Sequence, residues 1–309
     1  MITKQATANH EEWKALRSKY IGGSDAAAVV GMNTYISPYA LWAEKTGRLP
    51  GFDGNLATEV GTYLEEFVAQ KFAEVTGKKV RKCNLSWFNS DYPWAIANID
   101  REIVGEDAGL EIKTTSELNM QKFRCGEYPA NYYAQIVHYL AVTGKKRWYL
   151  AVLIGNREFK WFTIERDEEE IKALMEAEKN FKQLIDSDTP PAADGHPNTA
   201  DTLYTLYPDS HDDCIGIGFF ERELDNYFRL KKQAKDLEIT IDGIENRIKA
   251  HLGEFARGEG EKYKVSWKTQ YRQTFDSKKF IADHPELDVS AYYKKSNSRP
   301  FKVTEKKGA

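Results

Sequence analysis

Two short stretches decide the fold of this chain, and they read Ala97-Asn98-Ile99-Asp100-Arg101 and Gly109-Leu110-Glu111-Ile112-Lys113-Thr114. Both are predicted as strands, and the turn between them, which is rich in glycine and acid, predicts a hairpin. Strand side chains alternate between faces, so Glu111 and Lys113 point to one side and Ile112 to the other. A cross-strand Asp100 then completes a cluster of two carboxylates and one amine.

This cluster has the chemistry of a divalent-cation site. Carboxylate oxygens are hard ligands that suit Mg²⁺ or Mn²⁺, and a lysine beside such a cation suits hydrolysis of a phosphodiester. An exposed hairpin with an ordinary salt bridge would contain the same residues. The apolar neighbours Leu110 and Ile112, however, place the charges on half-buried strands. A carboxylate is costly there unless it is paired or metal-bound.

Composition restricts the class of protein. The chain has 309 residues, 41% of them hydrophobic, which is enough for one large domain or two smaller ones. We expect no membrane span and no signal peptide, since no run of 18 apolar residues occurs and residues 1–5 lack an apolar core. Three distant cysteines (Cys83, Cys125 and Cys214) indicate a reducing cytoplasm and argue against a zinc ribbon. The net charge of −3 disfavours a general polyelectrolyte binder but allows a local basic surface.

The chain divides into three stretches. Residues 1–185 alternate helix-like and strand-like segments, residues 186–218 are predicted as a connecting loop, and residues 219–309 form a C-terminal extension. A helix is predicted over 219–253, because its apolar residues follow spacings of three and four and form one stripe. That stripe would pack on its own domain, or would form a helical hairpin or a subunit contact. Strands are predicted at 263–267, after a break at 258–260, and at 299–303.

Two polar residues near the N-terminus are candidates for binding a phosphate. Ser24 and Asp25 follow Gly22-Gly23 and precede an alanine-rich run, which predicts a helix start. A helix N-terminus offers free N–H groups and the positive end of the helix dipole. If the chain folds back at the glycines, the Arg17 guanidinium can share one phosphate with that helix start. Otherwise Arg17 is a surface residue beside a capped helix.

Two further polar residues lie on predicted helices. Glu65 is at the edge of an apolar helix face and could reach a site formed by the sheet, although a solvated helix acid would look the same. That predicted face consists of Leu64, Phe67, Val68, Lys71 and Phe72. Gln135 is a polar residue within an apolar helix over 132–144, so it needs hydrogen-bond partners. The histidines show no metal-ligand spacing, and His138 is predicted to be a satisfied helix residue rather than a ligand.

The order of these elements resembles the PD-(D/E)XK nuclease superfamily: a helix with Glu65, a strand with Asp100, a strand with Glu-x-Lys and a helix with Gln135. More narrowly, residues 10–185 look like the YqaJ-type viral recombinases, a group related to phage lambda exonuclease. Residues 15–24 resemble the family's phosphate-contact segment, and residues 61–65 resemble its Gly-x-x-x-Glu helix. The C-terminal helix and Arg299-Pro300-Phe301 also look like those of phage-type members. The chain departs from the superfamily's name motif at Ile99, which stands where that motif has a proline.

The resemblance implies a restriction-endonuclease-like α/β fold, with a central mixed sheet flanked by helices, a long C-terminal helix and a small β element. It implies Mg²⁺ as the cofactor, with Mn²⁺ able to substitute. Asp100, Glu111 and the Ile112 carbonyl would bind the cation, and Glu65 would bind it directly or through water.

The resemblance also implies roles for the remaining polar residues. Lys113 would orient or deprotonate the attacking water and stabilise charge on the phosphate. Gln135 would hold Lys113 or the water in place. Arg17 and Ser24 would grip a 5′-terminal phosphate.

The implied reaction is 5′→3′ degradation of one strand of linear double-stranded DNA, which leaves a 3′ single strand for recombination by strand annealing. A homotrimeric ring around DNA, a phage single-strand annealing protein as partner and the cytoplasm of a bacterial host are implied as well. Three alternatives stay open. They are a structure-selective or sequence-specific endonuclease on the same fold, a non-catalytic DNA-binding or assembly protein, and a globular protein unrelated to DNA.

Overall fold

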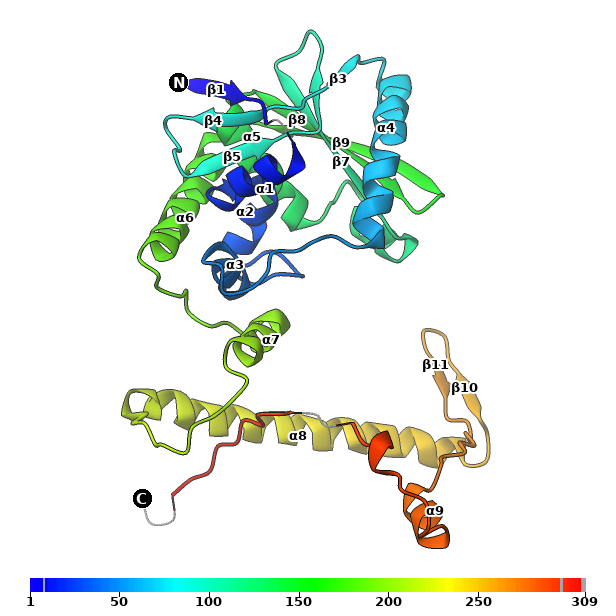
Figure 1. Cartoon of the computed structure of the whole chain (residues 1–309). Coiled ribbons are helices and arrows are strands. Elements are labelled where there is room, and N and C mark those ends of the chain that lie inside the picture. The colour runs from blue at the N-terminus through cyan, green and yellow to red at the C-terminus, as the bar shows by residue number, and fades with distance from the viewer. Residues whose placement is uncertain (8, 295–296, 307–309) are drawn as a thin grey trace. The chain divides into compact units, whose positions relative to one another are not determined.

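The computed structural model describes residues 1–7, 9–294 and 297–306 of the chain. It contains two compact units, Met1–Pro208 and Asp209–Ala309, and each is described by itself. The first unit has two β-sheets with helices packed around them, and the second is built on one long helix (Figure 1). No helix in the described part of the chain has both the length and the apolar character needed to cross a membrane.

The larger sheet of the first unit is mixed. Its order is β3-β6-β7-β8-β9, in which β7 and β8 run parallel and all other neighbours run antiparallel. The strands are β3 (Val80–Lys82), β6 (Arg101–Ile103), β7 (Ala108–Thr115), β8 (Arg147–Ile154) and β9 (Glu158–Glu165). β8 is apolar and buried along most of its length, as expected for a strand that is covered on both faces.

A smaller sheet, in the order β1-β4-β5-β2, stands beside the larger one. Its strands are β1 (Ile2–Gln5), β4 (Ser86–Asn89), β5 (Ala95–Asn98) and β2 (Ile21–Gly22). The short strand β2 pairs parallel to β5. Because β5 leads through Ile99 and Asp100 into β6, the chain passes from one sheet to the other at the predicted catalytic acid.

Helices cover both faces of the larger sheet. The helices of the first unit are α1 (His10–Ser18), α2 (Gly23–Val29), α3 (Pro38–Lys45), α4 (Leu56–Thr76), α5 (Ala130–Thr143), α6 (Glu168–Asp186) and α7 (Pro197–Leu206), with a 3₁₀ segment η1 (Glu117–Phe123). α4 packs on β7 and β8. α5 joins β7 to β8 and packs on the opposite face together with α6 (Figure 1).

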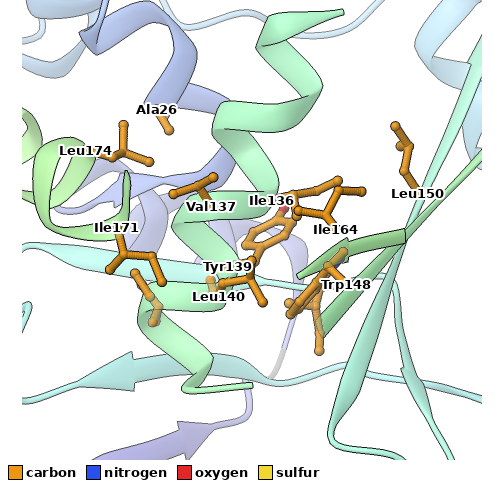
Figure 2. Packing of buried hydrophobic residues seen from close by; sticks show 14 of the residues in the cluster. Ala26, Ile136, Val137, Tyr139, Leu140, Trp148, Leu150, Ile164, Ile171 and Leu174 are labelled. Atoms are coloured by element: carbon orange, nitrogen blue, oxygen red, sulfur yellow. The ribbon is translucent and has the colours of Figure 1, made fainter. Parts of the chain in front are cut away.

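Separate hydrophobic clusters fill the two sides of this sheet. On the α4 side, Val68 and Phe72 pack with Leu110 and Tyr149. On the α5 side, Figure 2 shows side chains of α5, β8 and α6 packed together, among them Ile136, Leu140, Trp148, Leu150 and Ile171. Each such aliphatic side chain contributes roughly 1.5–3 kcal/mol when it is fully buried. The strand that carries Glu111 and Lys113 is therefore held from both faces.

The second unit contains η2 (Gly218–Phe220), α8 (Glu221–Leu252), the hairpin of β10 (Arg257–Glu259) and β11 (Lys264–Ser266), α9 (Ser277–Asp283) and η3 (Ser290–Tyr292). The helix predicted over 219–253 is confirmed. Its apolar stripe does not pack on its own domain in the single chain, because Leu237, Ile241 and Ile244 are 64%, 54% and 46% exposed. A contact with another subunit stays a prediction.

The hairpin predicted around the deciding stretches is confirmed, since β6 and β7 pair antiparallel with Arg101 opposite Leu110. The helix over 132–144 is confirmed as α5, whose C-cap Gly144 is left-handed at φ 69°. Two strands, β8 and β9, follow it.

Several sequence predictions are wrong in detail. Residues 186–218 are not a loop throughout, because α7 starts at Pro197, where proline suits the first helical turn, and packs against α3. Residues 299–303 form no strand, and the predicted break at 258–260 begins inside β10. Phe67 lies outside the buried face of α4 and is 53% exposed.

Candidate active site

Asp100 is held at the start of the hairpin by the neighbouring strand. It follows β5 and immediately precedes β6. Its Oδ2 accepts a hydrogen bond of 2.7 Å from the Ile112 backbone N–H on β7. The Asp100 carboxylate therefore lies beside the segment that carries Glu111.

Glu111 is the buried centre of the cluster, with 2% of its surface exposed. Its Oε1 is 2.6 Å from the Lys113 ammonium and accepts a 2.8 Å hydrogen bond from Gln135 Nε2. Its Oε2 is buried and has no hydrogen-bond partner among the described residues. Lys113 also lies 5.4 Å from the centre of the Tyr132 ring.

Burial and like charge raise the pKa values of both acids. Burial is the larger cause for Asp100, and the Glu111 charge adds to it, so that the pKa of Asp100 lies well above its ordinary value. Burial also raises the pKa of Glu111, although Lys113 opposes this. Burial alone would lower the pKa of Lys113, but the charges of Glu111 and Asp100 more than offset it, and its pKa is raised. Ionisation of Asp100 and Glu111 at the same time is therefore unfavourable, and both acids lie beside the protonated Lys113 ammonium.

Gln135 links this cluster to the helix that contains it. Its Nε2 also donates to the Tyr139 hydroxyl over 2.8 Å, one helical turn further along α5. The Tyr139 ring packs against Gly23 of α2, where a Cβ atom would stand only 2.4 Å from ring carbon Cε1. Glycine at this position therefore allows α2 to approach the tyrosine that contacts Gln135.

Glu65 lies near the two acids, but its carboxylate is paired with an arginine. The Arg101 Nη1 group donates to Glu65, and Arg101 Nη2 donates to Glu66 over 3.0 Å. Arg101 is itself 2% exposed. The negative charge of Glu65 still contributes to the raised pKa values of Asp100 and Glu111. Direct binding of a cation by Glu65 would require its carboxylate to leave the guanidinium.

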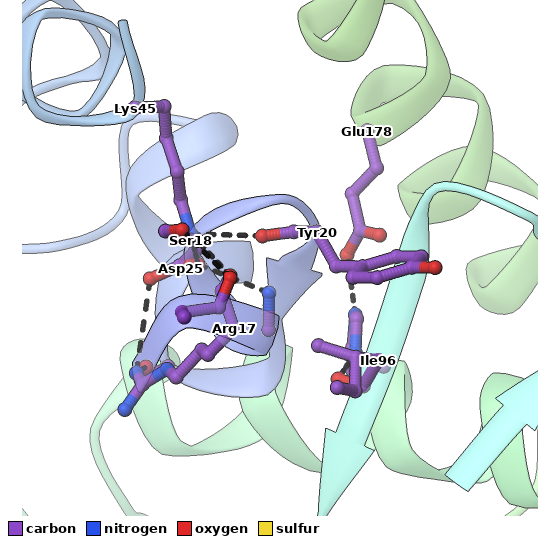
Figure 3. A network of polar contacts seen from close by, with 11 residues as sticks. Arg17, Ser18, Tyr20, Asp25, Lys45, Ile96 and Glu178 are labelled. Atoms are coloured by element: carbon purple, nitrogen blue, oxygen red, sulfur yellow. Dashed lines mark hydrogen bonds and ion pairs between the residues drawn. The ribbon is translucent and has the colours of Figure 1, made fainter. Parts of the chain in front are cut away.

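The two candidate phosphate-binding residues are in contact. The Arg17 Nη2 group donates to the Ser24 hydroxyl on α2. The sequence predicts a cap from Ser24 or Asp25, and Asp25 makes this contact: α2 begins at Gly23, and the Asp25 Oδ2 accepts from the Gly22 N–H over 3.0 Å. Figure 3 shows Arg17, Asp25 and Lys45 as one polar network.

Lys45 and Asp25 form an ion pair that holds the segment that carries Arg17. The Lys45 ammonium lies 2.6 Å from Asp25 and donates to the Tyr20 carbonyl over 2.8 Å. Burial would raise the pKa of Asp25, but Lys45 and Arg17 more than offset this, so its pKa is lowered. Because this carboxylate stays ionised, it keeps the short turn between Arg17 and Ser24 fixed.

The residues present suit a divalent cation, although no three acidic, histidine or cysteine side chains in the described part of the chain form a complete metal-binding group. The buried Glu111 Oε2 without a partner and the adjacent Asp100 carboxylate are hard oxygen ligands in a site that penalises unneutralised charge. Glu65 pairs with Arg101.

The structure thus brings Asp100, Glu111, Lys113 and Gln135 together, and separately Arg17 with Ser24. Ile112 supplies its N–H to Asp100, and its carbonyl as a ligand stays a prediction. Sequence reasoning missed Arg101 and Tyr139. An arginine directly after the acid and a tyrosine one helical turn after Gln135 were the available signals.

The sequence and the fold of this chain are similar to those of known proteins. A family model for the YqaJ-like viral recombinase domain matches residues 12–146. The uncharacterized protein YqaJ of Bacillus subtilis (strain 168) is 33% identical over 311 residues, covering 99% of this chain and 97% of that protein. The crystal structure of the alkaline exonuclease LHK-Exo from Laribacter hongkongensis matches with a TM-score of 0.50 and 22% identity. That match covers 58% of this chain and 94% of the exonuclease chain.

These similarities establish the fold class. The mixed sheet flanked by helices is the restriction-endonuclease-like fold of phage-type exonucleases, as predicted. The family indicated by the motifs of the sequence is confirmed as well.

Proposed function

The chain belongs to the YqaJ-like viral recombinase family, and from that premise we propose that it is a Mg²⁺-dependent nuclease that degrades one strand of linear double-stranded DNA in the 5′→3′ direction. The observation that supports this most is the buried cluster of Asp100, Glu111 and Lys113. Glu111 is 2% exposed and its Oε2 lacks a partner among the described residues, so a buried carboxylate oxygen is available to bind a cation beside Asp100. The similarity to an alkaline exonuclease agrees with the proposal.

Asp100 and Glu111 would hold the cation, together with the Ile112 carbonyl, and Mn²⁺ would substitute for Mg²⁺. Glu65 would take part through water, because Arg101 holds its carboxylate in the structure. When bound, the cation supplies positive charge against the phosphate and favours hydroxide over water as the nucleophile. It would also remove the repulsion between the two acids.

Lys113 would stabilise the negative charge that develops on the phosphate. Its raised pKa keeps it protonated near neutral pH, so orienting the attacking water suits it better than removing a proton from that water. Gln135 would act on Glu111, to which it donates a hydrogen bond, rather than on Lys113. It would fix the carboxylate that faces the cation.

Arg17 and Ser24 would bind the 5′-terminal phosphate. The guanidinium presents several N–H donors, and its contact with the Ser24 hydroxyl places a second polar group beside it. Binding of a terminal phosphate would position the first phosphodiester for cleavage and would give the reaction its polarity.

The product would be a 3′ single strand, for use in phage-type recombination by annealing. We further propose that three copies form a ring around DNA and that a phage single-strand annealing protein receives the product. A ring suits a chain of net charge −3, because only its inner wall needs to attract DNA.

The test uses purified protein with Mg²⁺, linear duplexes labelled at either the 5′ or the 3′ end, and a closed circular duplex. We expect early release of the 5′ label as mononucleotide and no cutting of the circle. Asp100→Asn should lose this activity. Glu106→Gln is a matched control, because Glu106 pairs with Lys78 outside the cluster. Cutting of the circle would identify an endonuclease, and no cleavage with either Mg²⁺ or Mn²⁺ would leave the acids a structural role only.

A further inference from the structure

The second unit contains a regular pattern that the nuclease site does not use. Residues 263–275 read Tyr-Lys-Val-Ser-Trp-Lys-Thr-Gln-Tyr-Arg-Gln-Thr-Phe. An aromatic residue occupies every fourth position, and each of the first three is followed directly by a lysine or arginine. The segment has three basic residues and no acidic residue, in a chain whose net charge is −3.

All four rings are exposed. Tyr263, Trp267, Tyr271 and Phe275 retain 80%, 49%, 96% and 74% of their surface, respectively. Clusters of exposed apolar groups mark interaction sites on soluble proteins, whereas single exposed ones are common. The four rings together therefore indicate a binding surface.

The structure fixes the beginning of the segment. β11 pairs with β10, and the Trp267 N–H donates to the Ala256 carbonyl over 3.0 Å. Lys264 pairs with Glu259 over 2.7 Å, but both side chains are mostly exposed. Among the described residues, Lys268 and Arg272 have no acidic partner within ion-pair distance, so their charges face solvent.

The pattern matches the chemistry of single-stranded nucleic acid. Aromatic faces stack on unpaired bases, and neighbouring cations neutralise phosphates. Residues four apart lie on one side of an extended chain, so the rings share one side and the cations share the other. The long, flexible stems of lysine and arginine allow their charged ends to reach the phosphates of a strand that is stacked on the rings. A buried protein contact would favour fewer charges at its centre, and paired DNA would hide the base faces that the rings need.

We propose that residues 263–275 bind single-stranded DNA, with Tyr263, Trp267 and Tyr271 stacking on bases and the three cations contacting phosphates. This proposal goes beyond the nuclease site and stands independently of it. The 3′ strand left by the proposed reaction is a ligand of this class.

The test measures binding of a fluorescent oligothymidylate to the full chain by anisotropy, in the presence of a chelator so that no cleavage occurs. We expect Trp267→Ala and Tyr271→Ala each to weaken binding roughly 5- to 150-fold, the range for loss of one stacked base. Phe219→Ala is the control, because Phe219 is 77% exposed and lies outside the segment. Trp267→Phe should restore most of the affinity, which separates stacking from folding of the hairpin.

Two further readouts identify the contacts. The double variant with Lys268→Gln and Arg272→Gln should make the dependence of log affinity on log salt shallower by about 1.4, or about 0.7 for each lost phosphate contact. Trp267 is the sole tryptophan after residue 161, so quenching by the oligonucleotide should be smaller in Trp267→Phe than in Trp13→Phe. Unchanged affinity in both alanine variants would overturn the proposal. Competition by duplex DNA that is as strong as competition by single-stranded DNA would overturn it as well. So would alanine variants that keep their affinity for single-stranded DNA and lose only binding to a protein.

Discussion

At the scale of single residues, Lys113 decides between a structural salt bridge and a catalytic group. Lys113→Ala removes the positive charge near the scissile phosphate, so we expect cleavage to fall at least about a hundredfold. DNA binding should stay largely intact. Single-turnover cleavage and equilibrium binding, measured on the same duplex, separate the two effects. Lys78→Ala is the matched control, because Lys78 also pairs with an acid, Glu106, outside the cluster. Retained cleavage in Lys113→Ala would remove its proposed role.

Arg17 is the residue proposed to bind a 5′-terminal phosphate. Arg17→Ala should bring the ratio of rates on 5′-phosphorylated and 5′-hydroxyl ends close to one, because the charged donor is lost. Arg48→Ala is the control, because Arg48 lies over the Trp42 ring at 4.4 Å and pairs with Asp188. A ratio that is the same in wild type and in Arg17→Ala would contradict the phosphate-binding role.

His138 and Glu178 form a buried pair that should make stability depend on pH. The His138 ring and the Glu178 carboxylate are fully buried. His138 Nδ1 is 2.7 Å from Glu178, and His138 Nε2 faces the Ile96 carbonyl. Burial alone would lower the pKa of His138, but Glu178, the carbonyl and the charge of Asp25 raise it above its ordinary value of 6.5. The charged form is therefore favoured in the folded state.

A raised histidine pKa contributes stability that is complete below 6.5 and is lost as the pH rises through the folded-state value. We expect the unfolding free energy of the wild type to lose this contribution as the pH rises above 6.5. Glu178→Gln should be less stable by roughly 3 kcal/mol at the acidic end and should lack most of the decline. Denaturant unfolding at each pH provides the measurement. If the unfolding free energies of wild type and Glu178→Gln change with pH in parallel, the His138–Glu178 pair is not the cause of the pH dependence.

At the scale of elements, the contact between α2 and α5 joins the two halves of the site. Gly23→Ala would place a methyl group against the Tyr139 ring, and that ring supports Gln135. We expect a loss of about 1–3 kcal/mol in stability, together with slower cleavage. Gly51→Ala is the control, because its added Cβ meets no atom within 4 Å. Thermal unfolding and cleavage rate are measured together, and an unchanged rate in Gly23→Ala would show that Tyr139 does not act through Gln135.

Local pattern was sufficient to predict the hairpin, α5 and the grouping of Asp100, Glu111 and Lys113, because alternation and turn chemistry act over a few residues. Contacts between distant segments were not predictable in this way. The ion pair between Glu65 and Arg101 depends on how α4 packs on β6. The close contact of Gly23 with Tyr139 depends on how α2 packs on α5. α7 was missed because prolines dominate its surroundings, although its Thr199 and Thr202 are buried.

At the scale of the whole molecule, the three hydrophobic clusters all lie within residues 1–208. The first unit therefore has its own core, whereas α8 exposes an apolar stripe. Leu230, Leu237, Ile241, Ile244 and Ile248 follow spacings of seven, four, three and four, which is typical of a helix that packs against another helix. This stripe is the best candidate in the second unit for a contact between subunits.

We expect the chain to assemble as a trimer. Light scattering should give three times the mass of the chain, and a charge within the α8 stripe should lower this mass, because a buried unpaired charge is costly. Leu237→Glu and Ile241→Glu introduce such a charge. Ile239→Glu is the matched control, because Ile239 is 60% exposed on the same helix but lies off the stripe. If all variants stay trimeric, the first unit must make the contact. A wild-type mass of one chain would instead end the ring proposal.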